Sequence, residues 1–100
     1  MDFVKHINHD SCDVILSGKF TFSDHHSFKT LLGALAEGQI KKLTLEMSKV
    51  EFVDSAALGI LLLVRDEAEK MGCELVLRYP AGQVKKMFEI SRFYDLFNIQ

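Results

Sequence analysis

The sequence predicts a single α/β domain over residues 1–100, built on a mixed, mostly parallel sheet. Strand-like and helix-like segments alternate along most of the chain. A helix that connects two consecutive strands favours parallel pairing with a right-handed crossover. The first two strand-like segments are separated only by a turn, which favours an antiparallel hairpin. We therefore expect four or five strands, with the helices packed largely on one face of the sheet.

The hairpin is expected near the amino terminus. Residues 3–7 alternate in the manner of a strand, and residues 8–10 have the Asn-His-Asp composition of a turn. Residues 12–17 are apolar and β-branched, which favours a second strand paired with the first. Gly18 ends this strand, and residues 19–22 form a further short extended piece.

Two more strands are expected later in the chain. Residues 43–47 alternate between apolar and polar side chains, which is typical of a central strand, and residues 73–78 form another extended segment. Residues 48–54 are expected to be a connector between the central strand and the next helix. Within this connector, we expect the side chains of Val50 and Phe52 to point inward.

Three helices are expected from apolar spacing and from the residues at their ends. The first covers about residues 24–37 with Gly38 as its stop, and the second runs from about 56 to 71. Pro80 suits the first position of a third helix. The apolar residues that follow Ser91 are expected to form a short terminal helix. The core-facing stripe of the second helix is expected to consist of Ala57, Ile60, Leu61, Val64, Ala68 and Met71.

Composition and charge indicate an ordinary globular protein. The apolar fraction is 48%, the charged fraction is 26% and the net charge is −2. Lysine and arginine are scattered rather than clustered, which argues against a nucleic-acid partner. No apolar stretch is long enough to span a bilayer, and the amino terminus lacks the apolar run of a signal peptide. We therefore expect a cytoplasmic protein with no membrane insertion.

Cysteine and histidine positions give no metal-binding pattern. Cys12 and Cys73 lie far apart in strand-like segments, and we expect both to be buried, reduced thiols. No Cys-x-x-Cys or similar ligand spacing occurs. His25 and His26 are adjacent on a predicted helix, where neighbouring side chains diverge. We therefore expect no metal and no cofactor.

The segment most informative about function is residues 52–64, where Asp54-Ser55 precedes an apolar helix. We expect Ser55 at or beside the N-cap of that helix, where free backbone N–H groups and the helix dipole favour an anion. Two interpretations are open: a structural cap, or an exposed hydroxyl that is phosphorylated. A phosphate on Ser55 would add up to about two negative charges beside Asp54 and near Glu51.

The first two turns of this helix are apolar nearly all round. Leu58 and Leu62 lie on one flank, Leu63 lies on the other, and Gly59 lies between the flanks. Either neighbouring elements cover these leucines, or the leucines form an exposed apolar surface for a partner. A glycine at this place lets a partner approach closely, although it weakens the helix by about 1 kcal/mol relative to alanine.

Three segments resemble the STAS domain family, typified by bacterial anti-sigma factor antagonists. Residues 52–59, Phe-Val-Asp-Ser-Ala-Ala-Leu-Gly, resemble the family's Asp-Ser-(Ser/Ala)-(Gly/Ala)-Leu-Gly signature. Residues 18–21, Gly-Lys-Phe-Thr, resemble its Gly-x-Leu-Asp segment, and residues 81–88 resemble the opening of its last main helix. The resemblance covers nearly the whole chain, from Phe3 to Ile99.

The resemblance implies a protein-interaction module in a partner-switching circuit, with no enzymatic activity. A serine kinase that is also the anti-sigma factor, with a histidine-kinase-like ATPase domain, would bind the unphosphorylated protein and phosphorylate Ser55. A PP2C-type phosphatase would reverse the reaction. Residues 20–22 and 58–63 resemble Gram-negative members, in some of which both activities belong to a response regulator. The partner face would contain, besides Ser55, the residues Asp54, Ala56, Leu58, Gly59, Leu62, Phe20 and Thr21.

The chain also departs from the family pattern. Thr21 stands where the Gly-x-Leu-Asp segment has its aspartate, which weakens any expectation of nucleotide binding. Ala56 and Ala57 replace the common Ser-Gly pair and remove a second hydroxyl. Ser55 is therefore the one obvious acceptor within the signature.

Three other functions are weighed against this interpretation. A serine hydrolase is disfavoured because no Gly-x-Ser-x-Gly elbow occurs and all four histidines lie outside the signature. Nucleotide binding is disfavoured because no glycine-rich phosphate loop occurs. The remaining alternative keeps the fold and makes the protein a cytoplasmic STAS subunit of a lipid- or ion-transport assembly. In that alternative Ser55 is only a cap, and the apolar flank binds an ATPase or a transporter helix.

Overall fold

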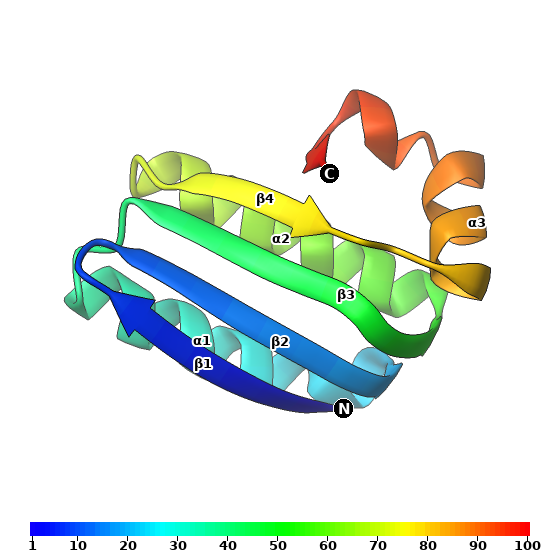
Figure 1. Cartoon of the computed structure of the whole chain (residues 1–100), viewed down its shortest axis with the longest axis horizontal. Coiled ribbons are helices and arrows are strands. Elements are labelled where there is room, and N and C mark those ends of the chain that lie inside the picture. The colour runs from blue at the N-terminus through cyan, green and yellow to red at the C-terminus, as the bar shows by residue number, and fades with distance from the viewer.

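Five strands form the single sheet of this protein, and the computed structural model describes all 100 residues of the chain. The strands are β1 (Asp2–Asn8), β2 (Ser11–Phe20), β3 (Lys42–Val53), β4 (Glu74–Arg78) and β5 (Asn98–Ile99). Their order across the sheet follows their order in the sequence (Figure 1). β1 pairs antiparallel with β2, and every other neighbouring pair is parallel. The prediction of a mixed, mostly parallel sheet that opens with a hairpin is confirmed.

Three α-helices pack against this sheet. They are α1 (His25–Glu37), α2 (Ser55–Lys70) and α3 (Gly82–Ile90), and two short 3-10 turns, η1 (Phe22–Asp24) and η2 (Phe93–Asp95), flank them. In Figure 1, α1 and α2 lie together behind the sheet, and α3 stands at the end of the sheet toward which the β4 arrow points. The predicted α/β architecture, with helices largely on one face, is confirmed.

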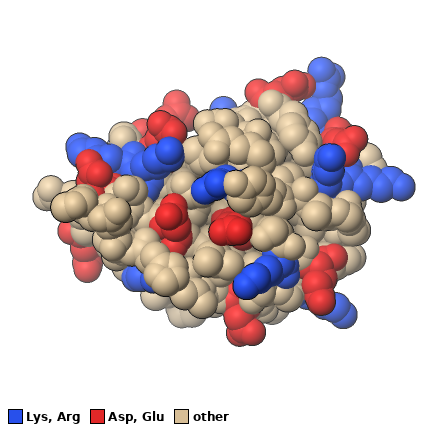
Figure 2. All heavy atoms as spheres, viewed as in Figure 1, with Lys and Arg blue, Asp and Glu red and all other residues tan.

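The core lies between the sheet and the α1–α2 layer. Cys12, Val14 and Leu16 of β2 are fully buried, since alternate residues of a strand face the same side. The predicted stripe of α2 is buried as well, except for Met71, which is only partly buried. Twenty-five buried residues form one continuous hydrophobic cluster. The other face of the sheet is turned to the viewer in Figure 2, where basic and acidic side chains are interspersed.

The connector expected at residues 48–54 belongs almost entirely to β3. Val50 is buried as predicted, but Phe52 is 39% exposed, so its expected inward direction is wrong. The buried residue is instead Val53. The pairing of β2 with β3 shifts register twice, once beside Gly18, whose φ is 87°. Each such bulge moves later side chains to the opposite face, which simple alternation cannot anticipate.

The chain end differs from the expected terminal helix. It forms the single turn η2 and then β5, which pairs in parallel with β4. Phe93 and Phe97 are buried and their rings lie 4.8 Å apart, whereas Leu96 is 42% exposed. The ring of Phe93 also stacks on that of Phe88 in α3, with centroids 5.3 Å apart, which anchors the turn to that helix.

Both cysteines are free and buried, as expected. None of the helices combines the length and the apolar character required to cross a bilayer.

Candidate functional site

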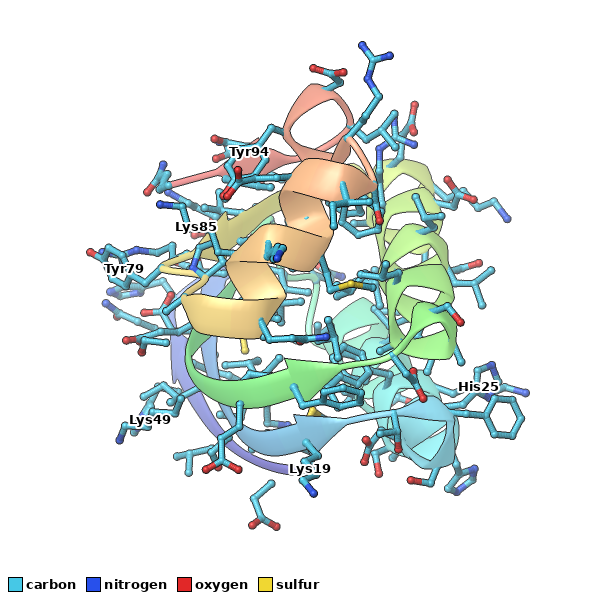
Figure 3. All side chains as sticks on the ribbon, turned by 90° about the vertical axis from the view of Figure 1, so that its right-hand side faces the viewer. Lys19, His25, Lys49, Tyr79, Lys85 and Tyr94 are labelled. Atoms are coloured by element: carbon cyan, nitrogen blue, oxygen red, sulfur yellow. The ribbon has the colours of Figure 1, made fainter.

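The candidate site lies where the parallel strands β2 and β3 end. Phe20 pairs with Val53, the last residues of the two strands. The next residues in the chain, Thr21 and Asp54, therefore leave the sheet side by side, and the backbone N–H of Asp54 donates to the carbonyl of Phe20 at 3.4 Å. Figure 3 looks onto this end of the sheet, with α3 in front. Functional loops of parallel α/β sheets occupy such an edge.

Asp54 is the N-cap of α2. Its backbone is extended, with φ −102° and ψ 178°, and its Oδ1 accepts a hydrogen bond from the backbone N–H of Ala57 at 2.7 Å. Its carbonyl accepts from the N–H of Leu58 at 3.2 Å, the first bond of the helix. We expected Ser55 at or beside the N-cap, and the structure places it directly after the cap, as the first residue of the helix. The cap itself is the carboxylate of Asp54.

Ser55 is exposed at the amino-terminal end of this 16-residue helix. The first backbone N–H groups of a helix have no intrahelical partner, and only that of Ala57 is bound by the Asp54 carboxylate. The remaining donors and the helix dipole favour a negative group near Ser55. The side chain therefore combines access from solvent with a local environment suited to an anion.

The predicted partner residues divide into accessible and buried side chains. Thr21, Asp54, Ala56, Gly59 and Leu62 are all partly exposed, and the structure gathers them around or directly beyond the start of α2.

Phe20 and Leu58, two of the predicted partner residues, are buried. Phe20 is 0% exposed because its ring stacks on that of Phe28, with ring centroids 4.8 Å apart. Leu58 is 8% exposed and joins the core cluster, and its helix α2 packs against β3, β4 and η1. For Leu58, the structure thus favours the alternative in which neighbouring elements cover the side chain.

Two other apolar side chains are exposed, one on the turn η1 and one further along α2. Phe22 is 71% exposed and stacks on His25, and the turn that holds it packs against α2. Leu63 is 52% exposed and lines a groove of about 490 Å³ between α1 and α2. Alternation alone would place Phe20 and Phe22 on the same side, so the sequence contained no signal for Phe22, whose side chain is exposed because β2 ends at Phe20 and the turn η1 begins at Phe22.

Thr21 is held by a neighbouring carboxylate. Its backbone N–H donates to Oδ2 of Asp24 at 2.8 Å, and its hydroxyl lies 2.9 Å from that of Ser23. Asp24 is only 7% exposed. The sequence contains no aspartate at position 21, but a carboxylate three residues later is buried against the same turn. This arrangement fixes the backbone of the turn beside the start of α2.

The positions of the histidine and metal-ligating side chains also bear on the role of Ser55. No hydrogen bond joins Ser55 to a histidine, and His25 and His26 are both exposed on α1. Nowhere in the chain do three or more His, Cys, Asp or Glu side chains gather closely enough to hold a metal ion.

Solved structures share this fold. The anti-sigma factor antagonist SpoIIAA, in its unphosphorylated form, superposes with a TM-score of 0.75 at 15% identity, covering 99% of this chain and 87% of that one. SpoIIAA from Bacillus in its phosphorylated form gives the same TM-score at 16% identity, covering 99% of this chain and 91% of that one.

Two sequence relatives agree with the fold comparison. A STAS-domain containing protein of Pseudomonas aeruginosa is 31% identical over 84% of this chain and 82% of its own length. BtrV of Bordetella bronchiseptica, provisionally named an anti-sigma factor antagonist, is 26% identical over 84% of this chain and 72% of its own length. The family model described as "Mlab, STAS domain" matches residues 4–98. This protein belongs to the STAS domain family.

Proposed function

We propose that this protein is an anti-sigma factor antagonist that works as a phosphorylation-controlled interaction switch, with Ser55 as the acceptor. The observation that carries the proposal is the exposed Ser55 side chain at the first position of α2, next to a cap formed by another residue. The names of BtrV and SpoIIAA support the same function. The protein itself would perform no catalysis.

Phosphorylation would act through charge. A phosphoserine carries about −1.5 to −2 charges at neutral pH. On Ser55 this charge would be tolerated by the helix start, but it would lie beside the Asp54 carboxylate within a surface that a partner must cover. Like-charge repulsion and the cost of desolvating the phosphate would then release the partner.

The proposed partner face follows the accessible part of the predicted set. It consists of Ser55 together with Thr21, Asp54, Ala56, Gly59 and Leu62. Phe20 and Leu58 would act from below, by holding the start of α2 in place, because buried side chains cannot contact a partner directly.

The proposed partners are two regulators in the cytoplasm. One is a serine kinase that also serves as the anti-sigma factor and carries a histidine-kinase-like ATPase domain. The other is a PP2C-type phosphatase, either separate or as part of a response regulator. The alternative is a STAS subunit of a lipid- or ion-transport assembly, in which Ser55 would not be modified.

Mass spectrometry of the protein isolated from its host tests the proposal. We expect a phosphate on Ser55 that disappears after phosphatase treatment. We expect Ser55→Ala to co-purify with a kinase-type ATPase at undiminished yield, and Ser55→Asp to lose at least about tenfold of that yield, because a charge would enter the interface. Recovery of a transport ATPase with an unmodified Ser55 would contradict the proposal and support the alternative.

A further inference from the structure

The carboxyl-terminal half of β3 has a strand neighbour on one side only. β4 ends at Arg78, which pairs with Glu46, whereas β3 continues to Val53. On the β2 side, Val53 is paired with Phe20. On the β4 side, the backbone groups of the last β3 residues have no strand to bind, and a buried backbone N–H or carbonyl without a partner costs about 1–3 kcal/mol.

The chain turns sharply after β4 and brings α3 across this bare edge. Tyr79 and Gly82 both have positive φ, 58° and 55°, and Pro80 between them cannot extend a sheet. α3 then packs against β3. In Figure 3, Lys85 marks α3 in front of the sheet, and Tyr79 marks the turn that leads into it.

The side chain of Gln83, in the first turn of α3, takes the place of the missing strand. Its Oε1 accepts from the backbone N–H of Val53 at 3.0 Å, and its Nε2 donates to the backbone carbonyl of Val53 at 2.9 Å. Only one orientation of the amide satisfies both bonds, since each end of the group has a single polarity. A primary amide thus reproduces the donor and acceptor of one residue of a neighbouring strand.

We propose that Gln83 is a positioning residue for the Asp54-Ser55 turn, through which α3 controls how Ser55 is presented. With Phe20 on one side and Gln83 on the other, Val53 is held from both directions. The next residue is Asp54, whose carboxylate must meet the N–H of Ala57 to start α2. Without the two hydrogen bonds to Val53, the backbone that leads into the Asp54 cap is less firmly oriented.

Amide hydrogen exchange on the purified protein tests the inference. Gln83→Met keeps the length of the side chain but removes both bonds. We expect the amides of Val53 and Ala57 each to lose about fivefold of their protection, since a net hydrogen bond is worth about 1 kcal/mol. Lys86→Ala, an exposed change on the same helix, is the matched control and should leave both amides unchanged.

Hydrogen exchange at the Ala57 amide distinguishes a positioning role of Gln83 from the loss of a local contact at Val53. If only Val53 loses protection, or if all amides lose protection equally, Gln83 is a structural residue and the inference is wrong. The inference also fails if neither amide changes.

A second variant offers rescue by protonation and keeps the test valid if Gln83→Met does not fold. In Gln83→Glu at neutral pH, a carboxylate faces the Val53 carbonyl, and one bond is replaced by repulsion. At about pH 4 a protonated carboxyl can again donate to the carbonyl and accept from the N–H. We expect protection of Ala57, taken relative to the wild type at each pH, to rise at least about threefold on acidification. A ratio that does not change with pH would contradict the inference.

The inference rests on the proposed function in one respect, namely that the positioned hydroxyl is the acceptor. Labelling of the Gln83→Met protein with radioactive ATP in a host extract addresses that part. If wild-type Ser55 is labelled, we expect the variant to be labelled at least about threefold more slowly, and an equal rate would overturn the inference. If wild-type Ser55 is not labelled, the proposed function fails, while hydrogen exchange still decides the role of Gln83.

Discussion

At the residue scale, the two members of the Asp54-Ser55 pair have separate tasks. The Asp54 carboxylate is bound to the N–H of Ala57 at 2.7 Å, while the Ser55 side chain is exposed one position later. A hydroxyl that does not cap the helix can be modified without loss of the cap. The structure thus separates helix formation from a possible signal, although the two side chains are adjacent in sequence.

This separation predicts unequal effects of two alanine substitutions. Asp54→Ala should lower the free energy of unfolding by about 1 kcal/mol, because the N-cap bond is lost. Ser55→Ala should change it by less than about 0.5 kcal/mol, as is usual for exposed sites. Urea denaturation followed by circular dichroism measures both.

Asp54→Asn is the control for the cap. Asparagine is as good an N-cap as aspartate, so most of the lost stability should be absent in this variant. If Ser55→Ala costs as much as Asp54→Ala, the assignment of the cap to Asp54 is wrong.

The sequence locates the start of α2 at residues 54–55 but does not show which of the two residues caps the helix. Asp and Ser are both strong N-cap residues, so the pattern at residues 54–55 places the helix start to within one residue and leaves the choice between them to backbone geometry. The exposure of Phe22 and the burial of Phe20 likewise depend on where β2 ends. Side-chain accessibility near a strand end is decided by packing that no local pattern contains.

At the scale of elements, α2 carries a position where space is left open on its outer side. Gly59 lies one turn after Ser55, and a Cβ built on it would meet no atom within 4 Å. Gly33, in α1, is similarly free of close neighbours. Neither glycine has a positive φ, so neither is required by the backbone. Neither the backbone nor a close neighbour in the fold therefore requires glycine at either position.

Alanine at these two glycines separates stability from binding. Gly59→Ala and Gly33→Ala should each raise the free energy of unfolding by about 0.5–1 kcal/mol, because glycine is the poorer helix former. Only Gly59→Ala should weaken partner binding, since its methyl group would enter the proposed interface. Urea denaturation and the yield of co-purified partner measure the two effects. Equal partner yields would place Gly59 outside the interface.

The elements were predictable to different degrees. The bounds of α1 and α2 agree with the sequence-based ones to within a residue, because apolar spacing and terminal glycines mark them locally. The extension of β3 through residues 48–53 was missed, since it depends on bulges in the pairing with β2. The two hydrogen bonds between Gln83 and Val53 join residues 30 positions apart, and no periodic pattern in the sequence indicates them.

At the scale of the whole molecule, one core encloses both thiols. Cys12 is 0% exposed and Cys73 is 7% exposed, and both belong to the 25-residue cluster. Burial raises the pKa of the Cys12 thiol and that of the Cys73 thiol, because the charged thiolate is poorly solvated there. The fold therefore favours the neutral form of these side chains over the thiolate.

This burial predicts a loss of stability at alkaline pH. In the unfolded chain a thiol ionises near pH 8.5, whereas in the folded protein it holds its proton to higher pH. Above about pH 8.5 the unfolded state binds fewer protons, so the free energy of unfolding falls as pH rises, by up to about 1.4 kcal/mol per pH unit for each thiol, until the folded pKa is passed. Urea denaturation of the reduced protein between about pH 7 and pH 10 measures this slope.

A variant with both Cys12→Ala and Cys73→Ala is the control. It should start from a lower stability, because two small cavities are created, but should show a shallower slope over the same range. The two proteins differ only at positions 12 and 73, so the difference between the slopes isolates the thiols. Parallel slopes would mean that the core can hold the thiolates, which is incompatible with the burial described above.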